Sequence, residues 1–425
     1  MLEFWKRKEK RVALEWGMIG YEEEEQTRPE FKGDVIASPV DGKDMIYYPP
    51  WQHASRARRA MGIILCMISV VVICIAAIYT FKWYLVYGWD WEYGKTYGGF
   101  IASLANSVQI QILNIIYKVV AVKLTEFENH RTETSHEDSL ILKLFCFQFC
   151  NSYGSFIYLA FVGEPIVGVE CERPCMTLLS INLTVVFAVQ LLVGNIMEVL
   201  LPIIKQRQKE KKELEGVESE DGGPVGLSLA EQQFLLATYD PIMGTLMDYA
   251  ELAVQFGYLT LFVVAFPLAP MLALINNYVE IRSDAYKLLS QMQRPVPRGA
   301  EDIGRWQDVF TAIACIAVVT NSALICLVYK DHIGLLGVSS RLWLFVSFQY
   351  CCFAFMKILE MAIPDVPNDV ELQLKRQEFL SKKVIYKMPD EEEEDAFQVL
   401  SDEEVEQIQV VMSPRVVSPG RQPGF

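Results

Sequence analysis

Carboxylates and one amide lie at paired helical spacing inside otherwise apolar parts of this 425-residue chain. The pairs are Asn195 with Glu198, Asp248 with Glu251, and Glu280 with Asp284. Residues three or four positions apart share one face of an α-helix. A charged side chain inside a bilayer costs at least roughly 2.5–3.5 kcal/mol, so intramembrane acids are candidates for a functional site.

The chemistry that suits these residues is binding of a hard divalent cation. Five carboxylates brought together without cations would repel one another. Arg282 is the one basic candidate that we identify in these stretches, and its spacing turns it away from Glu280 and Asp284. Calcium takes roughly six to eight oxygen ligands, whereas magnesium retains its waters. We therefore predict a calcium site formed by Asn195, Glu198, Asp248, Glu251, Glu280 and Asp284. The alternative is that the acids face separate water-filled crevices or lie at helix ends.

A second polar group lies in two apolar segments nearer the N-terminus. Its candidate members are Asn106, Gln109, Asn114, Lys143, Gln148 and Asn151. Such residues can form hydrogen bonds between membrane helices. They can also line a hydrophilic groove across the bilayer, and the sequence alone leaves both interpretations open.

Membrane helices must position these residues. Uncharged runs at 60–81, 96–117, 144–163, 174–197 and 309–329 each reach the roughly 20 residues that cross about 30 Å of hydrocarbon. A further hairpin is expected within 246–293, because Pro267 and Pro270 interrupt that interval. We predict an all-α, polytopic helical membrane protein with eight spans. They lie at about 60–87, 98–126, 139–162, 177–204, two within 246–293, 309–329 and 342–363.

The predicted spans define three regions and an orientation. Residues 1–59 precede the first span, 60–363 form the transmembrane domain, and 364–425 form an acidic C-terminal tail. Eight spans place both termini on one side. The basic clusters at 56–59, 205–212 and 294–305 fall on that side, which the positive-inside rule makes cytosolic. Cys171 and Cys175 would then lie in an outer loop, where they could form a disulfide.

Composition and motifs argue against other classes of protein. The formal net charge is −15 and no basic stripe is present, so we expect no nucleic-acid partner. The chain has no H-E-x-x-H motif, no G-x-G-D motif and no Walker lysine loop, so we expect no enzyme.

Several longer motifs resemble the anoctamin family. They are QFGYLTLF at 255–262, FPLAP at 266–270, NNYVEIRSDA at 276–285, Arg294-Pro295, DIG at 302–304, LEFWKR at 2–7 and RPE at 28–30. The resemblance extends to about Asp369. It implies a homodimer of chains with ten membrane helices, activated by cytosolic calcium, in which members conduct ions, scramble phospholipids or do both. The spans predicted here would be the third to tenth helices of that fold. The family's N-terminal domain and first two helices would precede them, and we expect an internal start or a short isoform.

The resemblance also implies roles for individual residues. Glu198, Glu251, Glu280 and Asp284 match the family's calcium ligands directly, and Asp248 stands where many members have glutamate. Asn195 lies one residue away from the position used in some members, which here is Gly194. Gln148 stands where chloride-selective members tend to have lysine, which favours lipid scrambling or weak ion selectivity.

The function that we expect is calcium-activated transport of phospholipids, chloride or other small ions. The groove would be lined by the helices at 98–126, 139–162 and 177–204, in the plasma membrane or the endoplasmic reticulum. The alternative is a non-conducting, calcium-binding membrane tether, or an inactive truncated isoform.

Overall fold

The computed structural model describes residues 2–23, 25–39, 42–88, 94–163, 175–189, 194–214, 228–328 and 337–385. The chain divides into two compact units, Met1–Asp365 and Val366–Phe425. The described residues are mainly helical, which confirms the predicted fold class. A short antiparallel hairpin of β1 (Asp34–Ala37) and β2 (Asp44–Tyr47) departs from it, with Asp34 opposite Tyr47.

The helices of the first unit run in chain order from α1 to α11. They are α1 (Leu2–Glu15), α2 (Pro50–Trp83), α3 (Gly94–Glu128), α4 (Glu133–Ile157), α5 (Cys175–Val189), α6 (Asn195–Leu214), α7 (Leu229–Leu235), α8 (Pro241–Leu261), α9 (Ala269–Tyr286), α10 (Trp306–Ala323) and α11 (Val338–Ala362). In the described residues, π-helical turns follow α2, α4, α9 and α10 of this unit, at Tyr84–Gly88, Tyr158–Gly163, Lys287–Gln291 and Leu324–Val328. In the second unit, the π-helical turn Ser381–Ile385 follows α12 (Asn368–Leu380).

Five helices in the described parts are long and apolar enough to cross a membrane. They are Pro50–Val86, Tyr97–Glu128, Glu133–Gly163, Trp306–Val328 and Val338–Ala362. The chain is therefore an integral membrane protein. The count of eight spans stays a prediction: Met176–Val189 is a shorter apolar helix, and α8 and α9 contain the acidic pairs.

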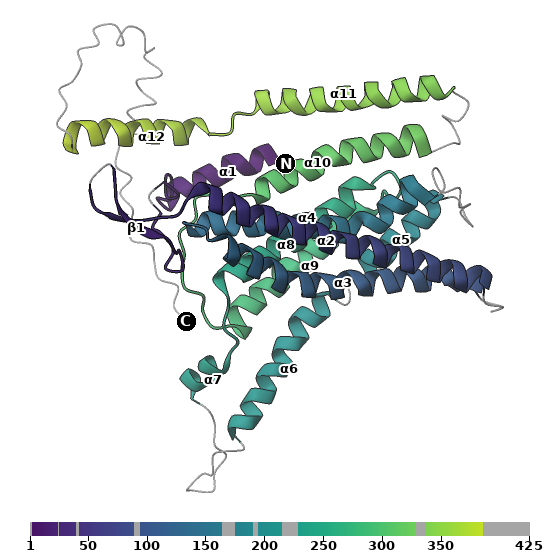
Figure 1. Cartoon of the computed structure of the whole chain (residues 1–425), viewed down its shortest axis with the longest axis horizontal. Coiled ribbons are helices and arrows are strands. Elements are labelled where there is room, and N and C mark those ends of the chain that lie inside the picture. Colours follow the sequence, from purple (N-terminus) through teal and green to yellow (C-terminus); the bar gives the residue numbers. More distant parts are fainter. Residues whose placement is uncertain are drawn as a thin grey trace, which may run out of the picture. The chain divides into compact units, whose positions relative to one another are not determined.

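The predicted helical hairpin is present, whereas the predicted single helix at 177–204 stays a prediction, because residues 190–193 lie outside the described part of the chain. α8 ends at Leu261 and α9 begins at Ala269, with Pro270 in its first turn, where proline is tolerated. By contrast, α5 ends at Val189 and α6 begins at Asn195, directly after Gly194. Figure 1 shows α5 along the bundle and α6 running in a different direction.

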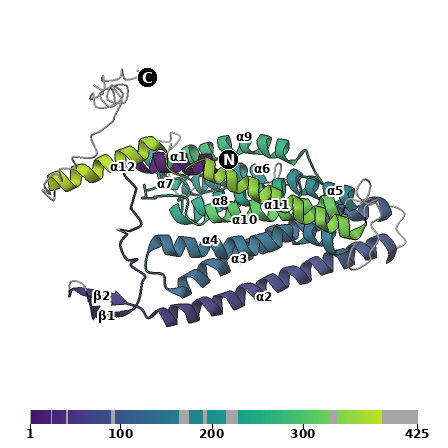
Figure 2. The same ribbon diagram turned by 90° about the horizontal axis from the view of Figure 1, so that it is seen from above.

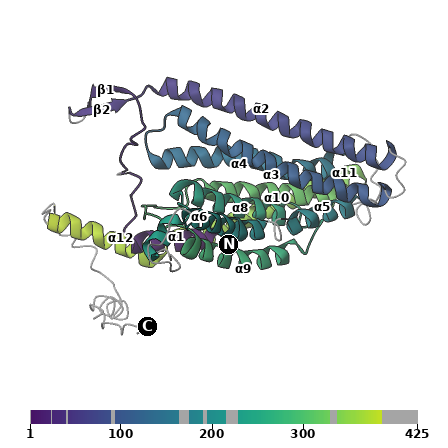
Figure 3. The same cartoon turned by 90° about the horizontal axis from the view of Figure 1, so that it is seen from below.

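Helix α4 is the centre of the bundle. Figures 2 and 3 show α2 along one edge, then α3 and α4, with α8 and α10 beyond them. α4 contacts α2, α3, α8 and α10. Its Phe147, Tyr153 and Phe156 are fully buried, and Tyr153 meets Tyr258 of α8 edge to face, with ring centroids 5.1 Å apart. Burial of these aromatic rings fixes how α3 and α8 face α4.

Candidate functional site

A network of amide side chains joins α3 to α4, and fully buried Asn151 is its centre. Nδ2 of Asn151 donates to Oδ1 of Asn114, at 2.8 Å, and to the carbonyl oxygen of Ile110, at 3.0 Å. Oδ1 of Asn151 accepts a hydrogen bond from Nε2 of Gln109, at 2.8 Å. Further along α3, Nδ2 of Asn106 donates to Oγ of Ser155, at 3.0 Å. We call the polar residues on these two facing helices the polar seam: Asn106, Gln109, Asn114, Gln148, Asn151, Ser152 and Ser155.

The polar seam is only partly satisfied by these bonds. Within the described residues, no hydrogen-bond partner reaches Oδ1 of Asn106, Oε1 of Gln109, Oε1 of Gln148 or Oγ of Ser152. The same holds for Oε1 of Gln255, a buried residue of α8. All five atoms are buried, and burying an unpaired polar group costs free energy. Such groups in native proteins usually meet water or a ligand.

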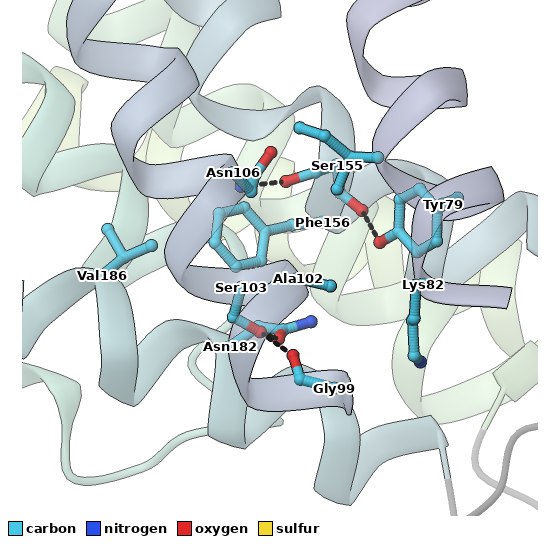
Figure 4. A pocket seen from close by; sticks show the side chains of 11 residues that line it. Tyr79, Lys82, Gly99, Ala102, Ser103, Asn106, Ser155, Phe156, Asn182 and Val186 are labelled. Atoms are coloured by element: carbon cyan, nitrogen blue, oxygen red, sulfur yellow. Dashed lines mark hydrogen bonds between the residues drawn. The ribbon is translucent and has the colours of Figure 1, made fainter. Parts of the chain in front are cut away.

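A small cavity lies beside Asn106, between α2, α3, α4 and α5 (Figure 4). Its volume of ≈ 30 Å³ is large enough to hold water. Ser103 of α3 lies on its wall, where Oγ is within hydrogen-bond distance of Oδ1 of Asn182 on α5 and of the carbonyl oxygen of Gly99. Tyr79 of α2 donates from its hydroxyl group to the carbonyl oxygen of Ser155, at 3.0 Å. The contact between Ser103 and Asn182 therefore joins α3 to α5 beside this cavity.

Lys143, which the sequence placed with the groove residues, has a carboxylate partner. Its Nζ donates to Oε2 of Glu128 at 2.6 Å, and both side chains are buried. The same oxygen accepts from Oγ of Ser139, at 2.8 Å, and lies 2.9 Å from Nε2 of His130. The ion pair joins the last residue of α3 to α4, so the charge of Lys143 is balanced locally.

The predicted calcium ligands of α8 and α9 lie on two helices that pack together. Asp248 and Asp284 are bridged by Lys287: its Nζ lies 3.3 Å from Oδ1 of Asp248 and 2.8 Å from Oδ1 of Asp284. This corrects the expectation that Arg282 was the one basic candidate. Arg282 instead donates to the hydroxyl group of Tyr278, at 2.7 Å, and its guanidinium lies over that ring.

The structure gives less information on the other predicted calcium ligands. Glu280 accepts a hydrogen bond from Nδ2 of Asn276, at 3.0 Å, and Glu251 is half-buried on α8. Asn195 and Glu198 belong to α6, but their side chains lie outside the described part of the chain. Within the part that is described, no three His, Cys, Asp or Glu side chains converge closely enough to hold a metal ion.

The donor set nevertheless has the chemistry that calcium requires. It consists of carboxylate oxygens, with the amide oxygen of Asn195 if that residue takes part, and calcium prefers oxygen ligands. The ammonium group of Lys287 also shows that the space between Asp248 and Asp284 attracts positive charge. These residues therefore suit a calcium ion, and in this structure the ammonium group of Lys287 lies between two of them, Asp248 and Asp284.

Sequence reasoning missed three features of this site. Lys287 lies three residues after Asp284, so helical spacing alone could have identified that pair. The contact of Ser103 with Asn182 and the ion pair of Lys143 with Glu128 each join different helices. A contact between different helices leaves no spacing pattern within either segment of the sequence.

Comparisons with known proteins agree with the motifs. A family model described as "Anoctamin: Calcium-activated chloride channel" matches residues 1–377. The chain is 30% identical to mouse Anoctamin-7 over 462 residues, which cover 91% of this chain and 53% of the relative. It is 33% identical to human Anoctamin-3 over 359 residues (78% of this chain, 36% of the relative). It is 29% identical to human Anoctamin-10 over 406 residues (91% and 57%). The chain thus spans between about a third and somewhat more than half of the length of these relatives.

Proposed function

Because this chain belongs to the anoctamin family, we propose that it is a calcium-regulated transport protein that moves phospholipids, small ions or both along the polar seam. The observation that carries the proposal is the presence of buried, unpaired side-chain oxygens on the three packed helices α3, α4 and α8. Hydrogen bonds between helices account for the NH₂ groups of Asn106, Gln109 and Asn151. They leave the side-chain oxygens of Asn106, Gln109 and Gln148 unpaired, and water or lipid headgroups along a path there would satisfy them.

The chemistry of the seam favours lipid headgroups and weak ion selectivity over chloride selectivity. Amide and hydroxyl oxygens accept hydrogen bonds from water and from ammonium headgroups, and they coordinate hydrated cations. Lys143 adds little field for anions, because Glu128 lies 2.6 Å away. Gln148 contributes an unpaired amide oxygen and no charge. Both features support phospholipid scrambling or poorly selective conduction.

Calcium regulation would act through α6. Asp248, Glu251, Glu280 and Asp284 would hold the ion from α8 and α9, and Asn195 and Glu198 would reach it from α6. Bound there, calcium supplies the positive charge that offsets the repulsion between these acids. α6 contacts α9 and the π-helical turn that follows α9, and it succeeds α5 in the chain.

A movement of α6 would reach the seam through α5. Asn182 of α5 contacts Ser103 of α3 and keeps the two helices together. An equilibrium between a closed and an open seam shifts only by the difference in ligand affinity between the two states. We therefore expect calcium to bind the open state more tightly. We expect the functional unit to be a homodimer with both termini cytosolic.

Reconstitution tests the proposal directly. The purified chain is placed in phosphatidylcholine vesicles that contain a fluorescent lipid, and lipid movement is measured with calcium and with EGTA. Ion conductance is recorded in planar bilayers under the same conditions. We expect faster lipid exchange, conductance or both with calcium. Calcium binding without either activity would favour the second candidate, a membrane tether that uses calcium structurally.

A further inference from the structure

Lys287 is the residue that connects the two acidic helices. Its ammonium group contacts one carboxylate on its own helix, Asp284 at 2.8 Å, and one on the neighbouring helix, Asp248 at 3.3 Å. The side chain of Lys287 is 7% exposed, whereas the two aspartates are 38% and 30% exposed. Lys287 is therefore the most buried member of the cluster.

This arrangement differs from an ordinary surface ion pair. Lys357 and Glu360 on α11 have the same i, i+3 spacing and the same 2.8 Å separation, but both are exposed and they belong to one helix. An exposed pair of that kind contributes about 0–1 kcal/mol. The ammonium group of Lys287 is buried and its partners are only partly exposed, so loss of one partner is compensated less by solvent than in an exposed pair. Lys287 thus stabilises one particular arrangement of α8 and α9.

The position of Lys287 links this cluster to α6. It is the first residue of the π-helical turn Lys287–Gln291, and α6 contacts that turn. π-Helical turns often occur at functional sites. Lysine has a flexible four-carbon stem, so its ammonium group can leave while the backbone stays in place.

We propose that Lys287 is a built-in competitor for calcium, whose ammonium group holds the place between Asp248 and Asp284 and must withdraw before a divalent cation can bind there. The inference rests on the calcium site of the proposed function and adds the residue that sets the calcium concentration needed for a response. With the lysine in place, Asp248 and Asp284 are already compensated, so calcium gains less free energy on binding. The intrinsic cation therefore raises the calcium concentration at which the protein responds.

Calcium affinity of the purified full chain tests this inference without reference to transport. Equilibrium binding of radioactive calcium is measured for the wild type, Lys287→Met and Lys287→Arg. We expect Lys287→Met to lower the Kd for calcium at least tenfold, because the competing charge is gone. Lys287→Arg keeps the charge and should stay within threefold of the wild type. Lys357→Met on α11 is the matched control and should leave the Kd unchanged.

Thermal unfolding supplies a second readout and guards against misfolding of the variant. In EGTA, Lys287→Met should melt below the wild type, because two carboxylates lose their partner. Calcium should raise its Tm by more than it raises that of the wild type. Lys287→Gln is made in parallel, and the same pattern is expected.

The possible outcomes separate the inference from the proposed function. An unchanged or higher Kd in Lys287→Met would overturn the competitor role, because the lysine would then be neutral or would help to position the ligands. If the wild type binds calcium but transports nothing, the proposed transport function fails and the competitor role is still judged by the Kd values. If neither the wild type nor Lys287→Met binds calcium, the inference fails together with the calcium site.

Discussion

The hydroxyl group of Tyr153 on α4 occupies the space that a β-carbon at position 257 of α8 would need. Tyr153 is fully buried, and this hydroxyl donates to the carbonyl oxygen of Val254, at 2.8 Å. Gly257 therefore lets α4 and α8 approach closely, which brings the helix of the polar seam against the helix of Asp248 and Glu251.

The first prediction concerns this close approach. Gly257→Ala should destabilise the protein by about 1–3 kcal/mol, because the added methyl group forces Tyr153 or the helices to shift. Thermal unfolding in detergent measures the effect. Gly62→Ala on α2 is the control: its β-carbon would meet nothing within 4 Å. The control should be neutral or slightly stabilising, because alanine favours helix. Equal loss of stability in both variants would contradict the packing argument.

The second prediction concerns the centre of the polar seam. Asn151→Leu removes the hydrogen bonds to Gln109, Asn114 and Ile110. At about 0.6 kcal/mol each on average in a membrane, their loss should cost about 2 kcal/mol. Lipid and ion transport should fall while calcium binding is retained. Ser69→Ala is the control, since the hydroxyl group of Ser69 is exposed and donates to Leu65 within its own helix. Full transport by Asn151→Leu would show that the substrate does not follow the seam.

The third prediction concerns the contact that joins α3 to α5. A Ser103→Cys/Asn182→Cys variant should form a disulfide under oxidising conditions, because the two side chains meet between α3 and α5. Calcium-dependent transport should then be blocked, and dithiothreitol should restore it. Each single cysteine variant serves as a control and should respond to neither treatment. Undiminished transport by the cross-linked protein would mean that α3 and α5 need not separate.

The fourth prediction distinguishes two roles for Lys143. Lys143→Met leaves Glu128 buried without its ammonium partner, which should cost roughly 3–5 kcal/mol in unfolding experiments. Lys143→Met/Glu128→Gln removes the unpaired charge as well and should recover part of the stability. The ratio of anion to cation permeability should stay the same in every variant that folds. A clear change in the permeability ratio would show instead that Lys143 lies on the ion path.

The fifth prediction concerns the calcium site. Glu251→Gln keeps the shape of the side chain and removes one negative charge, and ligand charge tunes calcium affinity. Activation should shift to calcium concentrations at least tenfold higher, a loss of about 1.4 kcal/mol. Maximal transport should be largely retained. Arg282→Gln is the control and should shift activation much less, because Arg282 pairs with Tyr278. Identical midpoints for the wild type and Glu251→Gln would favour the interpretation of the acids as wetted helix ends.

The sequence by itself determined the features that depend on one segment at a time. Length and apolar content identified membrane helices, because roughly 20 apolar residues suffice to cross a bilayer. The prolines at 267 and 270 placed the turn between α8 and α9. Helical periodicity showed that Asp248 and Glu251 share a face, as do Glu280 and Asp284. The motifs at 255–285 were specific enough to identify the family, which the family match over residues 1–377 confirms.

Only the tertiary structure decided which partner each of these faces meets. The carboxylate that balances Lys143 is Glu128 at the end of the preceding helix, and the cation between Asp248 and Asp284 is Lys287. Within the seam, packing of α3 on α4 paired the amide oxygens of Asn114 and Asn151 and left those of Asn106, Gln109 and Gln148 unpaired. Periodicity within a helix fixes which residues point the same way. The rotation and register between helices come from the fit of large buried side chains such as Tyr153 against Gly257, which is a property of the whole bundle.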